Sequence, residues 1–140
     1  MKLISFLHAG RHGWGVLRGT EVVVLTPVWP DVIAAQAPGL SCIALAHLQW
    51  LPPVPAPRKI LCVGLNYGRH VLEAGRELPA HPSLFPRFAD SVVGHREAVW
   101  KPRASDKFDY EGELVVVIGR GGRHIAVADA LSHVAGYTCM

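Results

Sequence analysis

Residues 107–119 read KFDYEGELVVVIG, a charged entry into an uninterrupted run of apolar, mostly β-branched residues. Such runs favour strands, and a strand places alternate side chains on opposite faces. Asp109, Glu111 and Glu113 are therefore predicted to share one face of a strand. The other face is predicted to carry Tyr110, Leu114, Val116 and Ile118.

Three neighbouring carboxylates repel each other, and they stay ionised together beside a buried run only if a cation or several donors compensate. A divalent ion is the simplest compensator. Because this motif offers only oxygen ligands, it favours Mg²⁺, Mn²⁺ or Ca²⁺ over Zn²⁺. The alternative is an exposed strand edge with solvated acids, and the Glu-x-Glu spacing alone does not decide between the two.

Composition limits the class of protein. The 140 residues are 50% apolar with a formal net charge of +3, enough for one ordinary domain, or a small domain plus part of another, with a core. No apolar run approaches the roughly 20 residues that cross a bilayer, and the N-terminus does not resemble a signal peptide, so we expect a cytoplasmic protein without a membrane partner. The arginines are scattered rather than clustered, which argues against a nucleic-acid partner.

The cysteines Cys42, Cys62 and Cys139 are odd in number and widely spaced in apolar surroundings. This usage indicates reduced core thiols in a reducing compartment. A catalytic cysteine is the less favoured alternative.

The N-terminal third is predicted to be a small β-meander with strands at residues 3–7, 13–17 and 22–25, separated by glycine-rich turns. Trp14 should pack on this sheet. Asp31 and Ser41 are each expected to cap a short helix, ending at residues 37 and 48, because their side-chain oxygens suit the free N–H groups of a first turn. The proline-rich residues 51–57 can form neither ladder nor helix, so we place a domain boundary there.

Residues 59–64 form a short apolar stretch typical of a strand covered on both faces. A short helix should follow, capped by Asn66 and ended by Gly75. His70 and Glu73 are three residues apart on it and so lie on one face. A carboxylate beside an imidazole raises its basicity, as a water-activating general base requires. The alternative, which spacing alone favours, is a surface pair worth a few tenths of a kcal/mol.

The remaining residues are predicted to be short elements and loops. Pro86 makes residues 83–88 an edge or irregular strand, because proline lacks a ladder donor. Strand candidates at 92–94 and 98–100, a loop at 101–108, a turn at 119–122, a helix at 129–134 and a strand from Gly136 follow. Arg87 offers a planar guanidinium either to a substrate carboxylate or to a surface acid. No glycine pattern here matches a phosphate-binding loop.

Several of these segments together resemble the fumarylacetoacetate hydrolase family. They are ILCVGLNY at 60–67, His70 with Glu73, PSLF at 82–85, DYEGEL at 109–114, VIG at 117–119 and AGYT at 135–138. The resemblance runs in order from about Lys59 to the last residue. Each motif alone is a weak signal, but the combination is specific. It favours a metal site at the acidic strand over a solvated strand edge, and a catalytic dyad of His70 and Glu73 over a surface pair.

The resemblance implies an α+β, mixed β fold: a small N-terminal β-meander domain (1–50), a linker (51–58), and the first part of a mixed β-roll catalytic domain (59–140), usually in a homodimer. Glu111 and Glu113 correspond to metal-ligating acids for Mg²⁺, Mn²⁺ or Ca²⁺. His70 and Glu73 correspond to a dyad that activates water. Tyr67 and Arg87 are the expected substrate contacts.

Members of this family hydrolyse C–C bonds in β-diketo acids such as acylpyruvates and fumarylacetoacetate, decarboxylate oxaloacetate, or isomerise intermediates of aromatic catabolism. The residues agree with this chemistry. A metal chelated by adjacent oxo and carboxylate oxygens can hold an enolate, while a nearby base supplies hydroxide.

The chain departs from the family at its end. In the family, an Asn-Asp segment after Gly-Tyr-Thr supplies the third metal ligand. The present sequence ends at Cys139 and Met140, before it reaches such a segment. The sequence therefore resembles the N-terminal portion of such an enzyme, and Asp109 is a poor substitute ligand. The alternative function is a truncated, catalytically silent module that acts as a binding or assembly partner.

Overall fold

The computed structural model describes residues 1–25, 41–110 and 112–140. The chain forms two compact units, residues 1–53 with 94–140, and residues 54–93. The helix expected after Asp31 and the candidate ligand Glu111 lie outside the described residues. Within the described residues, no helix is long and apolar enough to span a bilayer. The domain boundaries predicted above stay a prediction.

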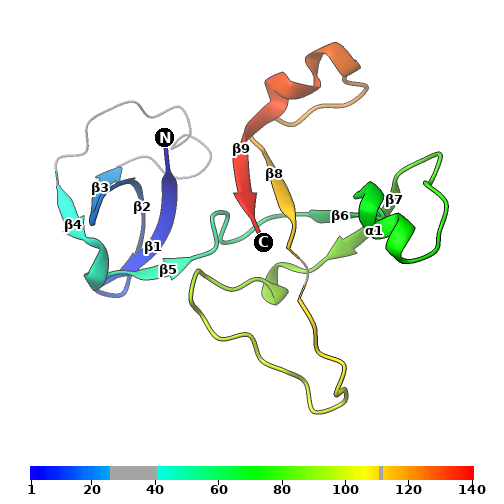
Figure 1. Cartoon of the computed structure of the whole chain (residues 1–140). Helices are drawn as coiled ribbons and strands as arrows, with labels where there is room; N and C mark the ends of the chain where they lie inside the picture. The colour runs from blue at the N-terminus through cyan, green and yellow to red at the C-terminus, as the bar shows by residue number, and fades with distance from the viewer. Residues whose placement is uncertain (26–40, 111) are drawn as a thin grey trace. The chain divides into compact units, whose positions relative to one another are not determined.

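Five antiparallel strands make the N-terminal sheet: β1 (Leu3–His8), β2 (Arg11–Arg18), β3 (Glu21–Leu25), β4 (Cys42–Ala44) and β5 (Gln49–Leu51), in the order β4-β3-β2-β1-β5 (Figure 1). The three strands of the expected meander are confirmed. The β1–β2 hairpin turns at Ala9 and Gly10, whose φ values of 47° and 73° are the positive values that a type I′ turn requires.

The core of this unit lies on both faces of the sheet, because successive side chains of each strand alternate. Ile4, Phe6 and Val22 form one buried cluster, and Trp14 with Leu25 forms the second, so the expected packing of Trp14 is confirmed. The ring of Phe6 lies over Gly13, where an added Cβ would come within 2.7 Å of it. A larger residue at position 13 would therefore have to displace the buried Phe6 ring.

The helix expected after Ser41 is wrong. Residues 42–51 form β4, the short 3₁₀ helix η2 (Leu45–His47) and β5. The carbonyl of Ser41 accepts the N–H of Val24 at 2.9 Å, and β4 pairs with β3. Ladder hydrogen bonds to a neighbouring strand have replaced the local helix cap that the sequence pattern favoured. After β5, residues 52–58 have no regular structure, as their prolines predict.

In the unit of residues 54–93, β6 (Ile60–Gly64) pairs antiparallel with β7 (Ser83–Arg87), and the 3₁₀ helix η3 (Ala89–Ser91) follows. Both strands were predicted. The expected cover on both faces of β6 is wrong within the described residues, because Leu61 is 62% exposed and Val63 is 38% exposed. Two strands make a ribbon with one neighbour for each, so alternate apolar side chains face solvent.

The predicted helix is present as α1 (Gly68–Glu73), between β6 and β7 (Figure 1). Its N-cap is Tyr67 rather than Asn66, and no side chain accepts a hydrogen bond there. Its end at Gly75 is confirmed: φ is 62°, and the N–H groups of Gly75 and Arg76 donate to the carbonyls of Leu72 and Val71, both at 3.0 Å. These two bonds are a Schellman motif, which satisfies the last carbonyls of the helix.

The remaining elements are β8 (Leu114–Ile118), the 3₁₀ helix η4 (Val127–His133) and β9 (Val134–Cys139). β8 and β9 form a second antiparallel ribbon. The helix expected at 129–134 is thus 3₁₀ rather than α, and the strand expected from Gly136 begins two residues earlier. The strand candidates at 92–94 and 98–100 are wrong, because these residues pair with none of the strands that the structure describes.

Residues 94–97 instead form a turn that packs on β5. Gly94 lies so close that an added Cβ would collide with the Trp50 carbonyl oxygen. The ring of His95 meets Trp50 edge-on with centroids 5.2 Å apart, and Gln49 Nε2 donates to Glu97 Oε1 at 3.1 Å. These contacts attach the segment to the N-terminal sheet.

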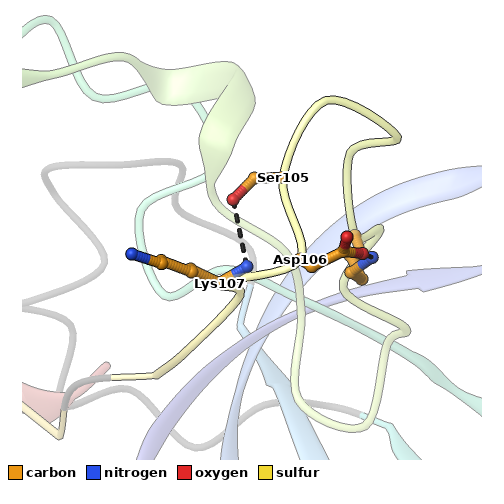
Figure 2. A network of polar contacts seen from close by, with 4 residues as sticks. Ser105, Asp106 and Lys107 are labelled. Carbon is orange, nitrogen blue, oxygen red and sulfur yellow. Dashed lines mark hydrogen bonds and ion pairs between the residues drawn. The ribbon is translucent and has the colours of Figure 1, made fainter.

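The loop at 101–108 is confirmed and is held by short-range polar contacts. Lys101 Nζ pairs with Asp106 Oδ1 at 2.9 Å. The N–H of Lys107 donates to Ser105 Oγ, a bond drawn as a dashed line in Figure 2, and the two atoms are 3.1 Å apart. Both charged groups of the ion pair are exposed, so the pair contributes little to stability.

Candidate active site

Glu113 is the one predicted metal ligand that the structure describes. Its N–H donates to the Met140 carbonyl at 2.8 Å, and its carbonyl accepts the Met140 N–H at 3.0 Å, which extends the β8–β9 ladder by one residue pair. Its side chain is half-buried, as are Val115 and Val117, which alternation places on the same face. Across the residues described, no hydrogen bond or ion pair engages its carboxylate.

The predicted face of three carboxylates is only partly realised. β8 begins at Leu114, and Asp109 lies outside the ladder, where its Oδ1 accepts the N–H of Tyr110 at 2.8 Å. This bond between adjacent residues is a local side-chain to backbone interaction, of a kind that can compete with strand pairing. The apolar face expected to be buried is exposed instead, at Leu114, Val116 and Ile118.

The donor chemistry of Glu113 fits a hard divalent cation, because a half-buried carboxylate that no cation among the described residues pairs with is an available oxygen ligand. Among residues 1–25, 41–110 and 112–140, no three His, Cys, Asp or Glu side chains are grouped so that they could hold a metal ion. The role of Glu113 as a metal ligand stays a prediction, and it calls for further ligands from outside this set, of which Glu111 is the predicted one.

The predicted dyad lies on α1. His70 and Glu73 are both exposed, and the described structure joins them by neither a hydrogen bond nor an ion pair. Val71 between them is fully buried and anchors the helix. The helix thus presents His70 and Glu73 to solvent, together with Leu72, which is 73% exposed, while Val71 is buried. The catalytic roles of His70 and Glu73 stay a prediction.

Tyr67 and Arg87, the predicted substrate contacts, belong to the same unit as the dyad. The Tyr67 carbonyl accepts the N–H of Val71 at 3.1 Å, and its side chain is 44% exposed. Arg87 ends β7, opposite Ile60, and is exposed. The structure therefore brings Tyr67, His70 and Glu73 together on one short segment, while Arg87 lies on the strand paired with β6.

Sequence reasoning missed Leu65, the residue between β6 and the segment that carries Tyr67. Its φ is 56°, in the left-handed region. No sequence signal marks this conformation, because glycine and asparagine are the residues that commonly adopt it.

In comparison with protein families, residues 59–140 match the model described as fumarylacetoacetate (FAA) hydrolase C-terminal. Among curated proteins, the human protein named oxaloacetate tautomerase FAHD2A, mitochondrial, is 43% identical over 106 residues. The alignment covers 76% of this chain and 33% of the human protein. The chain thus spans about a third of the length of this relative.

Solved structures match nearly the whole chain. The fumarylacetoacetate hydrolase from Exiguobacterium antarcticum has a TM-score of 0.77 at 32% identity and covers 99% of this chain and 54% of its own. Maleylpyruvate hydrolase from Sphingobium, solved with manganese(II) and pyruvate, has a TM-score of 0.73 at 28% identity, with 99% and 57% covered. The predicted mixed β fold is thereby confirmed.

Proposed function

The chain belongs to the fumarylacetoacetate hydrolase family, and from this premise we propose that the protein, at its natural length, is a metal-dependent enzyme that acts on oxo-carboxylic acids through an enolate. The observation that carries the proposal is the family match over residues 59–140, which contain every candidate site residue. The matched relatives and structures bear the names of tautomerases, hydrolases and isomerases. These reactions share an enolate next to a carboxylate.

Tautomerisation of a β-oxo dicarboxylate such as oxaloacetate is the first reaction we propose. It is supported by the names of curated relatives that are 39–43% identical. The second is hydrolysis of a C–C bond in a β-diketo acid, supported by maleylpyruvate hydrolase with its bound pyruvate at 28% identity. Decarboxylation and isomerisation of related acids require the same enolate and remain further alternatives.

Each candidate residue then has a distinct task. Glu113, together with Glu111, would hold Mg²⁺, Mn²⁺ or Ca²⁺. When bound, the ion supplies positive charge that stabilises an enolate. His70, oriented by Glu73, takes the proton from the carbon between the two carbonyl groups in tautomerisation, or from water in hydrolysis.

Tyr67 and Arg87 are proposed to orient the substrate. An arginine binds a carboxylate through two parallel hydrogen bonds, which fixes the plane of the substrate. An exposed tyrosine offers a hydroxyl that both donates and accepts.

Location and assembly are also proposals. We propose a cytoplasmic homodimer, although the human relative is named as mitochondrial. Size-exclusion chromatography with light scattering, and microscopy of the tagged protein, test these two points separately.

The experiment that tests the function uses the purified protein at its natural length, treated with EDTA and then reloaded with Mg²⁺ or Mn²⁺. Loss of the enol absorbance of oxaloacetate measures tautomerisation, and release of pyruvate from an acylpyruvate measures hydrolysis. Either rate should fall on chelation and return with metal. Absence of both reactions at every metal concentration would contradict the proposal.

A further inference from the structure

The junction between β6 and α1 contains an unusual backbone conformation. Leu65, directly after Gly64 at the end of β6 and two residues before the N-cap Tyr67, has a φ of 56°. A side chain with a Cβ is disfavoured in this left-handed region, because the Cβ approaches the following carbonyl oxygen. Such residues persist only where their surroundings determine the conformation, and they concentrate at functional sites.

Ala9 provides a comparison within the same chain. It also has a positive φ, 47°, but it lies beside Gly10 in the β1–β2 hairpin. A type I′ turn requires positive φ at both central residues, so the hairpin explains Ala9. Leu65 lies instead where a strand passes into a helix, and a hairpin does not account for it.

The helix that follows depends on its ends. With six residues, α1 is too short to be stable alone. The buried side chain of Val71 fixes its middle, and the Schellman motif at Gly75 fixes its C-terminal end. Its N-terminal end has no side-chain cap, so the path of the backbone through Leu65 sets where the helix begins.

We propose that Leu65 is a positioning residue, whose left-handed backbone sets the direction in which α1 leaves β6 and so aims His70 at the substrate. This inference rests on the proposed function, in which His70 is the general base. A base must lie within hydrogen-bond reach of its proton, and a misplacement of about 1 Å can lower the rate roughly 10²-fold.

The test compares substitutions that differ in their tolerance of positive φ. Leu65→Val introduces a β-branched residue that resists the left-handed region, whereas Leu65→Asn adopts it readily. Ala9→Val is the matched control, because it places the same strain in a hairpin that contains no candidate residue. Melting temperature, kcat and KM are measured for each variant at natural length with Mn²⁺.

We expect Leu65→Val and Ala9→Val both to lower the melting temperature by a few degrees. Only Leu65→Val should lower kcat, by about 10- to 100-fold with KM little changed. Leu65→Asn should keep kcat close to wild type although it lacks the leucine side chain. An equal loss in Leu65→Asn and Leu65→Val, or an unchanged kcat in Leu65→Val, overturns the inference.

Two further variants keep the outcome decisive. If Leu65→Val does not fold, Leu65→Ala and Leu65→Gly replace it, because both remove the side chain and only glycine accepts positive φ freely. The glycine variant should then have the higher melting temperature and kcat, and the reverse order overturns the inference. The wild-type protein and His70→Ala, measured in parallel, separate the two proposals. Absence of both reactions in the wild-type protein contradicts the proposed function, and full activity in His70→Ala contradicts the role of His70 as the base and with it this inference. Activity lost in His70→Ala but kept in Leu65→Val means that only the role of Leu65 fails.

Discussion

The N-terminal sheet and the two ribbons, β6–β7 and β8–β9, are built from similar apolar strands but differ in what covers them. The sheet buries side chains on both of its faces, in the clusters around Phe6 and Trp14. The ribbons expose theirs, namely Leu61, Leu84, Phe85, Leu114, Val116, Ile118 and Tyr137. Strand formation and burial of a strand's faces are therefore separate outcomes. A short apolar run specifies the first, and only additional packed elements supply the second.

The N-terminal sheet and the rest of the chain are also expected to differ in whether their residues serve stability or catalysis. All the candidate site residues lie between Tyr67 and Glu113, outside the N-terminal sheet. Substitutions in the sheet should therefore act on folding, and substitutions in the ribbon regions should act on catalysis. The following predictions test that division.

The largest effect is expected for Glu113→Gln, which removes an ionised ligand while keeping the size of the side chain. Metal-dependent turnover at natural length should be abolished, because a divalent ion held by few carboxylates loses affinity steeply when one is neutralised. Calorimetric titration with Mn²⁺, alongside activity, checks this. Asp109→Asn is the control, since Asp109 lies outside the ladder, and it should retain turnover. Unchanged metal activation in Glu113→Gln would sink the ligand assignment.

His70→Ala should lower the rate by about 10²- to 10⁴-fold, the usual contribution of a positioned general base, with Mn²⁺ affinity nearly intact. The exposure of His70 predicts a melting temperature close to wild type. Kinetics and metal titration on the same preparation distinguish the roles. Weakened metal binding with an unchanged rate constant would make His70 a ligand rather than a base.

Trp14→Ala should reverse this pattern by destabilising the protein about 3–5 kcal/mol, because it leaves a cavity in the buried cluster with Leu25. Denaturant unfolding measures the loss. At temperatures where the variant is folded, kcat should be unchanged. A specific loss of kcat in the folded variant would show that the sheet takes part in catalysis and would break the proposed division.

The ribbons offer a smaller test. The 140-residue chain on its own should self-associate, because it presents apolar side chains and open strand edges. Replacing both Leu61 and Ile118 by serine should reduce this association while changing stability little, since both side chains are largely exposed. Light scattering across a concentration series measures the effect. A wild-type chain that stays monomeric throughout would show that these faces are covered in solution.

The smallest effect is expected for Lys101→Met, which removes the ion pair with Asp106. Because both groups are exposed, the melting temperature should not change measurably at physiological salt. Thermal scans at low and high salt check this. A clear loss would show that the loop before the acidic motif contributes more to folding than its exposure indicates.

The sequence correctly predicted the elements that depend on a local residue pattern. The strands of the meander, the β6 strand and the helix end at Gly75 follow from alternation, β-branched runs and turn residues. It failed where distant partners decide. Ser41 looked like a helix cap, but pairing of β4 with β3 prevailed.

The candidate site shows the same limit. The residues of the acidic pair and the dyad could be named from the family resemblance, which reads residue identities in order. The positive φ of Leu65 and the close approach of Gly94 to Trp50 could not be predicted in this way. Both are features of backbone geometry, which the residue types at these positions do not specify.

The strand order β4-β3-β2-β1-β5 has a consequence for how the protein emerges from the ribosome. Hairpins β1–β2 and β2–β3 join residues close in sequence and can form first, within microseconds of leaving the exit tunnel. β5 must then close a much longer loop to reach β1, yet every strand of this sheet has been synthesised by Leu51. The N-terminal sheet can therefore be complete before residues 94–97 are synthesised. Trp50 is then already in its folded position when Gly94 packs against it.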